Sequence, residues 1–308
     1  MRIKYEKIQT PREMFSLFLP LHTDSLNFRK VWVYRGQKCS DAKLKGFRKL
    51  RTSLEKALSE SGHSLDQAPR IEMGLFRKFK RQSEQFLAHI PGQGDYMEWL
   101  ALMQHHGAPT RLLDWTFSFF VALYFAVAEL GPKESAELWA VDMQYLNSRM
   151  RKLFPRRSDR RCAEDDPNAQ VHRNFERMFM RREPKQFVCS MNPYRFNTRL
   201  IIQQGIFLCP GDITRPFGEN LKNHFTSQDE LDDHKKVFRI ENGARNDLME
   251  VLYRMNIGEA SLFPGLDGFA RSLRDVLAFR KVTKMFPPDS SYIKKKVWRE
   301  TMESSSAS

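Results

Sequence analysis

The chain has 308 residues, of which 41% are apolar, which is enough for one large domain or two small ones with a packed core. Lys and Arg number 51 against 37 Asp and Glu, and the resulting net charge of +14 favours a polyanionic neighbour such as RNA, DNA, an acidic protein or a phosphorylated cofactor. The four cysteines form no CxxC pair, which argues against a redox motif or a zinc ribbon. The N-terminal segment lacks the form of a signal peptide, and the longest apolar run, 119–128, is about half of what a bilayer span needs. We therefore expect a soluble, cytoplasmic protein without a membrane partner.

The first half of the chain predicts one strand followed mainly by helices. We expect a short buried strand over 31–34, a Lys-rich helix over about 41–60, an amphipathic helix over 71–89 and a helix over 96–105 capped by Asp95. Gly107-Ala108-Pro109 predicts a turn, and 110–115 is short and extended or looped. Residues 117–130 are apolar all round, which predicts a helix buried on every side, with Thr116 as its N-cap.

The second half predicts several strands and two amphipathic helices. We expect strands over 137–141, 187–189, 200–209 and 237–240, and helices over 245–255 and 266–279. Gln203-Gln204-Gly205 falls inside the third of these strands, where a polar pair and a glycine indicate a bulge or a close approach. The basic segment 149–184 is interpreted as a mobile insertion or lid, with a solvated charged surface as the alternative. The tail 286–308 is expected to be flexible, and the pattern as a whole predicts one α+β domain.

Several well-known catalytic motifs are missing. The sequence has no P-loop, no complete GxGxxG, no HExxH, no EF-hand loop and no GxSxG elbow. His105 and His106 are adjacent, so on a helix they would point about 100° apart. No metal site is therefore predicted.

Polar residues concentrate instead at strand ends and turns. They are Arg35, Gln104, His105, His106, Arg111, Asp114, Thr116 and Gln203. Each has a structural interpretation: Arg35 could pair with Asp114, Arg111 could bridge loop carbonyls, and His106 could satisfy a carbonyl. Together they exceed what capping requires, which indicates a site.

Four stretches of the sequence resemble the FRG domain family. They are Tyr34-Arg35-Gly36-Gln37, QHHGAPTRLLDWT at 104–116, ALYFA at 122–126 and QQGIF at 203–207, and LFPGLDG at 262–268 fits the end of the pattern. The family is named for a Phe-Arg-Gly signature, whose first position is Tyr34 here. The resemblance covers about residues 30–275 and implies a single FRG domain over 1–285. Because the family occurs mostly in bacteria and mobile elements, it also implies a toxin or anti-phage defence protein with an antitoxin or defence-system partner.

The order of these motifs is also similar to that of ADP-ribosyltransferases. Those folds place an aromatic-Arg-Gly on a first strand, a Ser/Thr strand before a buried helix, and a Glu or Gln motif on a later strand. Arg35, Thr116 with Ser118, and Gln203 or Gln204 would fill these places. The resemblance implies an α+β fold with a short mixed or antiparallel split sheet, surrounding helices and an ADP-ribosyltransferase-like core.

This second resemblance implies an enzyme that consumes NAD, as a transferase to a protein or nucleic-acid acceptor or as a glycohydrolase. The implied catalytic residues are Arg35, His106, Asp114, Thr116 and Gln203. The implied NAD-binding residues are Tyr34, Arg35, Gly36, Gln104, His105, Arg111, Trp115 and Gln204. Since Gln203 stands where a carboxylate is usual, Asp114 would supply the negative charge and His106 would act as acid or base. The alternatives are a non-enzymatic module that binds a nucleotide or nucleic acid, and, less favoured, a nuclease.

Overall fold

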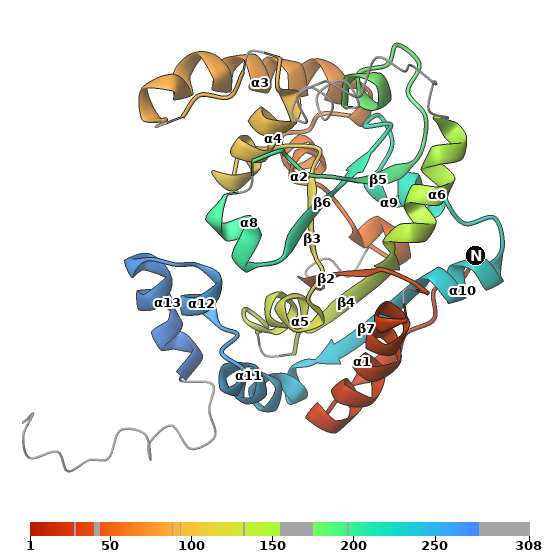
Figure 1. Cartoon of the computed structure of the whole chain (residues 1–308), viewed down its shortest axis with the longest axis vertical. Coiled ribbons are helices and arrows are strands. Elements are labelled where there is room, and N and C mark those ends of the chain that lie inside the picture. The colour runs from red at the N-terminus through yellow and green to blue at the C-terminus, as the bar shows by residue number, and fades with distance from the viewer. Residues whose placement is uncertain are drawn as a thin grey trace, which may run out of the picture.

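A computed structural model of the protein describes residues 1–27, 29–39, 44–87, 89–92, 94–131, 133–154, 175–195 and 197–276 (Figure 1). Within these residues, one mixed sheet has the strand order β1-β7-β4-β2-β3-β6-β5. The strands are β1 (Glu6–Ile8), β2 (Trp32–Lys38), β3 (Leu113–Thr116), β4 (Ser135–Asp142), β5 (Val188–Met191), β6 (Gly205–Pro210) and β7 (Lys235–Glu241). Neighbours are antiparallel except β1 and β7, which are parallel. The predicted α+β class is confirmed.

Helices surround this sheet (Figure 1). The α-helices are α1 (Pro11–Leu26), α2 (Ser53–Glu60), α3 (Ala68–Ser83), α4 (Tyr96–His105), α5 (Phe119–Val127), α6 (Met143–Leu153), α8 (Thr198–Ile202), α9 (Phe217–Lys222), α10 (Gln228–His234), α11 (Arg245–Arg254), α12 (Glu259–Leu262) and α13 (Leu266–Val276). Short 3-10 turns are η1 (Gly46–Lys49), η2 (Leu65–Gln67), η3 (Glu84–Phe86) and η5 (Asn242–Ala244).

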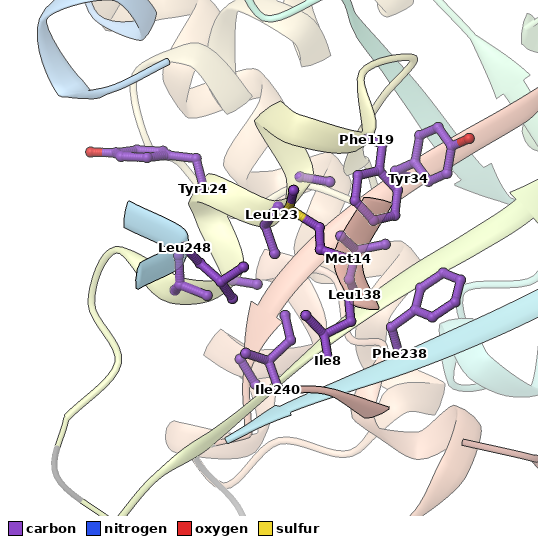
Figure 2. Close-up of a cluster of buried hydrophobic side chains, with 14 of the residues drawn as sticks. Ile8, Met14, Tyr34, Phe119, Leu123, Tyr124, Leu138, Phe238, Ile240 and Leu248 are labelled. Carbon is purple, nitrogen blue, oxygen red and sulfur yellow. The ribbon is translucent and has the colours of Figure 1, made fainter. Parts of the chain in front are cut away.

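The two faces of the sheet are covered by different helices. On one face, α1, α5 and α11 pack on the inward side chains of β2, β4 and β7, and Figure 2 shows Phe119 and Leu123 of α5 gathered with Leu138 and Phe238. On the other face, η1, α6, α9 and α10 pack on Trp139 and its neighbours. Because alternate residues of a strand point to opposite faces, each central strand contributes to both cores.

Helix α5 lies unusually close to β2, and Gly36 is the reason. A Cβ atom at this position would stand 1.7 Å from the carbonyl oxygen of Ala122 and 2.6 Å from the backbone nitrogen of Ala126. Only a residue without a side chain permits this approach. The glycine therefore sets the distance between the strand and the helix that lines the site.

The sheet opens between β2 and β3. Strand β2 pairs with β4 along its whole length, from Trp32 to Lys38, whereas it pairs with β3 only at Tyr34 and Thr116. Strand β3 pairs along its whole length with β6 on its other side. The two halves of the sheet therefore separate beyond a single residue pair.

Several predicted elements are confirmed, among them the strands around 31–34, 137–141 and 237–240 and the helix over 96–105. Asp95 occupies the N-cap position of α4, but its carboxylate accepts from the Gly92 N–H rather than from the helix. The predicted helix over 41–60 is wrong in its described part, because Thr52 starts a separate α2 by accepting from the Glu55 N–H.

Two predictions near the site are wrong. The N-cap of α5 is Ser118, whose hydroxyl accepts from the Val121 N–H, while Thr116 ends β3. Residues 200–209 are not one strand, because Asn197 caps the short α8 and Gln203 ends it. Gln204 then takes a left-handed conformation, with φ of 47°, before β6 begins.

The basic insertion at 149–184 is only partly described. Its start belongs to α6, and at its end Phe175, Met178 and Phe179 are buried against α3, α4 and β5. Residues 155–174 and the predicted tail 286–308 lie outside the described residues.

Candidate functional site

A cleft of about 290 Å³ lies where β2 and β3 separate. One wall is β2, another is β3, and α5 and the turn after α8 close the remaining sides. Its polar or charged lining residues are Arg35, Gln37, Lys38, Asp114, Thr116, Glu129, Arg199 and Gln203. The cleft thus gathers groups from segments that are far apart in the sequence.

Arg35 bridges the two strands at the cleft. Its Nη1 donates to the backbone carbonyl of Asp114 at 2.6 Å, and its Nε donates to Gln37 Oε1 at 3.4 Å. Burial lowers the pKa of the guanidinium, and the nearby Asp114 carboxylate opposes this. Arg35 and Asp114 are therefore neighbours, but the expected ion pair is not formed between these two described side chains, because the hydrogen bond goes to the Asp114 main chain.

The carboxylate of Asp114 is held from α4. Gln104 Nε2 donates to Asp114 Oδ2 at 2.7 Å, and Gln104 Oε1 accepts in turn from the Thr110 hydroxyl at 2.5 Å. Asp114 Oδ1 has no hydrogen bond to any residue that the structure describes. One carboxylate oxygen is therefore fixed, and the other is open to a ligand.

Thr116 and Gln203 join β3 to the turn before β6. The Thr116 hydroxyl donates to the Gln203 carbonyl at 2.6 Å, and Gln203 Nε2 donates to the Leu262 carbonyl at 3.2 Å. The Thr116 hydroxyl also accepts from the Ser118 N–H at 3.0 Å. The hydroxyl thus donates one hydrogen bond and accepts another within the protein. We therefore assign Thr116 to holding the walls of the cleft together.

A smaller cavity of about 50 Å³ adjoins the cleft and shares Asp114, Arg199 and Gln203 with it. Gln104 and His105 also line this cavity. Burial lowers the pKa of His105, and its electrostatic interactions with His106 and Arg199 lower it further. His105 is therefore a neutral imidazole at pH 7.

Comparison of the sequence with models of known protein families gave one match. Residues 30–135 match the family model of the FRG domain. The match to the FRG domain covers less than half of the chain. The matched segment of the FRG domain includes Arg35, Gly36, Gln104, His105 and Asp114, whereas Arg199 and Gln203 lie beyond it. Comparisons with curated proteins and with solved structures gave no match.

Some residues predicted for the site lie outside both the cleft and the smaller cavity. His106 is exposed at the C-cap of α4, and neither it nor the exposed Gln204 lines the cleft or the smaller cavity. Arg111 is 4% exposed, forms an ion pair with Glu72 of α3 and donates from Nη1 to the Phe179 carbonyl. Arg111 joins α3 to the end of the basic insertion 149–184, and it lines neither the cleft nor the smaller cavity.

The aromatic residues of the FRG domain signature serve the core. The Trp115 side chain is 3% exposed and packs in the core on the far side of the sheet, beside Val33 and Trp139. The Tyr34 ring packs edge-on against Phe119, with centroids 5.5 Å apart, and burial raises the pKa of its hydroxyl. The two rings are therefore packing groups of the two cores on opposite faces of the sheet.

Arg199 is a site residue that sequence reasoning missed. It lies on α8 four positions before Gln203, and its guanidinium carbon stands 4.7 Å from the centroid of the Phe263 ring. A helix assignment for this segment would have placed Arg199 and Gln203 on one face, because residues four apart are neighbours on a helix.

Metal-binding groups and membrane-spanning helices were also sought among the described residues. Among the described residues, no group of three or more His, Cys, Asp or Glu side chains is placed to hold a metal ion. In the same part of the chain, no helix combines the length and apolarity that crossing a membrane requires.

Proposed function

We propose that the cleft between β2 and β3 binds NAD and cleaves its nicotinamide–ribose bond, by hydrolysis or by transfer of ADP-ribose. The observation that carries the proposal is the meeting of Arg35, Asp114 and Gln203 around one cleft, from β2, β3 and the turn before β6. The resemblance to ADP-ribosyltransferases implied this order of segments. The opening of the sheet between β2 and β3 agrees with the split sheet that it also implied.

The two arginines suit the pyrophosphate of NAD. An arginine offers a planar fork of donors that matches phosphate oxygens. Arg35 uses Nε and Nη1 within the protein, while its Nη2 has no hydrogen bond to a described residue. Arg199 lines both the cleft and the smaller cavity. A volume of about 290 Å³ fits part of a dinucleotide, so we expect the remainder to extend past Arg199.

Asp114 supplies the charge that the reaction requires. When the bond between ribose C1′ and the nicotinamide nitrogen breaks, its electron pair leaves with nicotinamide and positive charge develops on the ribose. A preorganised carboxylate stabilises such a charge, and Gln104 holds Asp114 for this role. Water, or an acceptor group, then forms the new bond to C1′ and gives up a proton.

His105 takes the role that we had expected for His106. It lines the cavity that contains Asp114, and its lowered pKa leaves it neutral and able to accept the proton of the attacking group. Mutation can distinguish His105 from His106 as the proton acceptor, because His106 lines neither the cleft nor the smaller cavity.

The direct experiment measures nicotinamide released from NAD by the purified full-length chain. Asp114→Asn should lower the rate at least about 100-fold, as loss of an electrostatic stabiliser does. Asp66→Asn is the matched control, since Asp66 is exposed on η2 and lines neither space. His105→Ala should also slow release, whereas His106→Ala should not. Equal rates for Asp114→Asn and the wild type, with both folded, would refute the catalytic role.

Binding without turnover is the second candidate, and one residue favours it. Gln203 lines the cleft where ADP-ribosyltransferases usually carry a carboxylate. A nucleotide-binding module would bind NAD or ADP-ribose without releasing nicotinamide. Calorimetric titration alongside the release assay separates the two.

The role in the cell follows from the enzyme proposal. We propose a toxin or anti-phage effector that acts by depleting NAD or by modifying a protein or nucleic acid, held in check by an antitoxin or defence-system partner. Expression of the wild type should lower cellular NAD and viability, whereas Asp114→Asn should leave both unchanged at equal protein levels.

A further inference from the structure

A second cavity, of about 900 Å³, lies on a different part of the surface. Its walls come from the N-terminal residues, η1, the segment before β4 and α9. None of the residues that line it also lines the cleft of the proposed NAD site. It is therefore a second and separate concave site.

The lining of this basic cleft is strongly positive. Seven of its residues are Lys or Arg, and two are Glu: Arg2, Lys45, Arg48, Lys49, Lys133, Lys222, Arg239, Glu134 and Glu219. Lys49 is paired with the buried Glu137, Arg239 with Glu241, and Glu134 with Lys38.

Five of the cations have no such partner. Arg2, Lys45, Arg48, Lys133 and Lys222 are exposed and form no ion pair with any residue in the described ranges. They come from four separate segments, so no local helix or strand pattern requires them to meet. Like charges gathered in a concave site focus the field and attract an anion.

An aromatic ring lies within the same cleft. Tyr5 is 39% exposed, and Lys49 Nζ stands 5.9 Å from its ring centroid. A basic groove that also contains an exposed aromatic ring is typical of sites where a nucleic-acid backbone is held while a base stacks. An inorganic anion or a carboxylate side chain has no flat aromatic face to stack on the ring, whereas a nucleobase does.

We propose that the basic cleft binds single-stranded nucleic acid. The cations from these four segments hold the phosphates, and Tyr5 stacks on a base. A single strand fits because its bases are open to stacking and it is narrow enough to enter a concave site. The proposal rests on this cleft alone and does not depend on NAD chemistry.

The experiment measures fluorescence anisotropy of a labelled oligothymidylate of about 12 nucleotides, within the range that one such site covers. The triple variant Lys45→Gln, Arg48→Gln, Lys222→Gln should bind at least about tenfold more weakly. The slope of log affinity against log salt should become less negative by about 2, since each lost phosphate contact to a single strand removes about 0.7. Tyr5→Ala should weaken binding about tenfold, while Tyr5→Phe should retain it.

A matched control separates the cleft from general positive charge. Arg77, Lys78 and Arg81 are exposed on α3, outside the basic cleft, and their replacement by Gln removes the same charge. This control should change affinity less than about twofold, far below the loss of a specific contact set. Equal weakening in both triple variants, no measurable binding by the wild type, or displacement of the oligonucleotide by equimolar polyglutamate would each overturn the proposal. Asp114→Asn should bind the oligonucleotide like the wild type, so failure of the NAD proposal would leave this result unaffected.

Discussion

Arg35 Nη1 donates to the carbonyl oxygen of Asp114 at 2.6 Å, across the gap where β2 leaves β3. The bond joins the two halves of the sheet at the point where strand pairing stops. It also fixes the guanidinium beside the Asp114 carboxylate within the same cleft. This contact therefore links the two strands and places the guanidinium next to Asp114 at the opening.

Replacement of Arg35 by Lys should weaken NAD binding at least about tenfold. A lysine keeps the charge, but a single ammonium lacks the planar fork that can bridge to Asp114 and hold a phosphate at once. Calorimetric titration with NAD gives the affinity, and Arg70→Lys on the exposed face of α3 is the matched control. An unchanged NAD affinity for Arg35→Lys would show that the Arg35 guanidinium does not bind NAD.

Gly36→Ala should destabilise the fold by at least about 1–3 kcal/mol, the cost of overpacking a core. The new methyl group would overlap the backbone of α5, which cannot retreat without losing its packing on the sheet. Urea unfolding followed by circular dichroism measures the change. Gly74→Ala is the control, because a Cβ there meets nothing within 4 Å and alanine favours the interior of α3 by about 0.5–1 kcal/mol. Equal stability of the two variants would contradict the close approach of β2 and α5.

Arg111→Met should cost about 3–5 kcal/mol of unfolding free energy, because it leaves the buried Glu72 carboxylate without its partner. The double variant Glu72→Leu, Arg111→Met should recover most of the loss, since two apolar side chains replace the pair. Thermal unfolding of the three proteins tests both statements. If Arg111→Met instead kept full stability and lost NAD binding, Arg111 would belong to the site after all.

Glu55→Gln should make stability fall in mild acid. Burial raises the pKa of Glu55 to about 7 and lowers that of His224 to about 4. The contribution of Glu55 is therefore complete below about pH 4.5 and is lost as pH rises towards 7. The contribution of His224 is complete above about pH 6.5 and is lost as pH falls towards 4. The two effects oppose each other in the wild type.

Without Glu55, its contribution no longer opposes the His224 effect in this range. The unfolding free energy of Glu55→Gln should then drop by about 2 kcal/mol between pH 7.5 and 5, relative to the change in the wild type. Denaturant titrations at the two pH values measure this difference. Glu60→Gln, at an exposed position on α2, should follow the wild type. A Glu55→Gln profile parallel to the wild type would show that Glu55 is ionised in the folded state at both pH values.

Local patterns predicted the central part of the fold well. The VWVY run predicted the start of β2, and the Asp-capped apolar period predicted the helix up to His105. Of the five residues expected to meet, Arg35, Asp114, Thr116 and Gln203 line one cleft, whereas His106 lies outside it. Their role in catalysis stays a prediction.

Contacts between residues far apart in the sequence determine the features that local patterns did not predict. Arg111 is 39 positions from Glu72 in sequence, and no spacing rule joins them. Trp115 and Asp114 point to opposite faces of β3, which follows from strand alternation once 113–116 is known to be a strand with a core on the Trp115 side. The apolar residues of α8 resemble the start of a strand, so the turn at Gln203 and Gln204 and the role of Arg199 depended on the Asn197 cap.

Hydrogen–deuterium exchange with and without saturating NAD tests the central claim most directly. The account predicts slower exchange in 113–118 and 203–207, which line or adjoin the opening, and no change in 68–83 of α3. It also predicts that Arg35→Lys loses this protection. Unchanged exchange throughout the wild-type chain, or protection confined to other segments, would contradict binding of NAD in the cleft between β2 and β3.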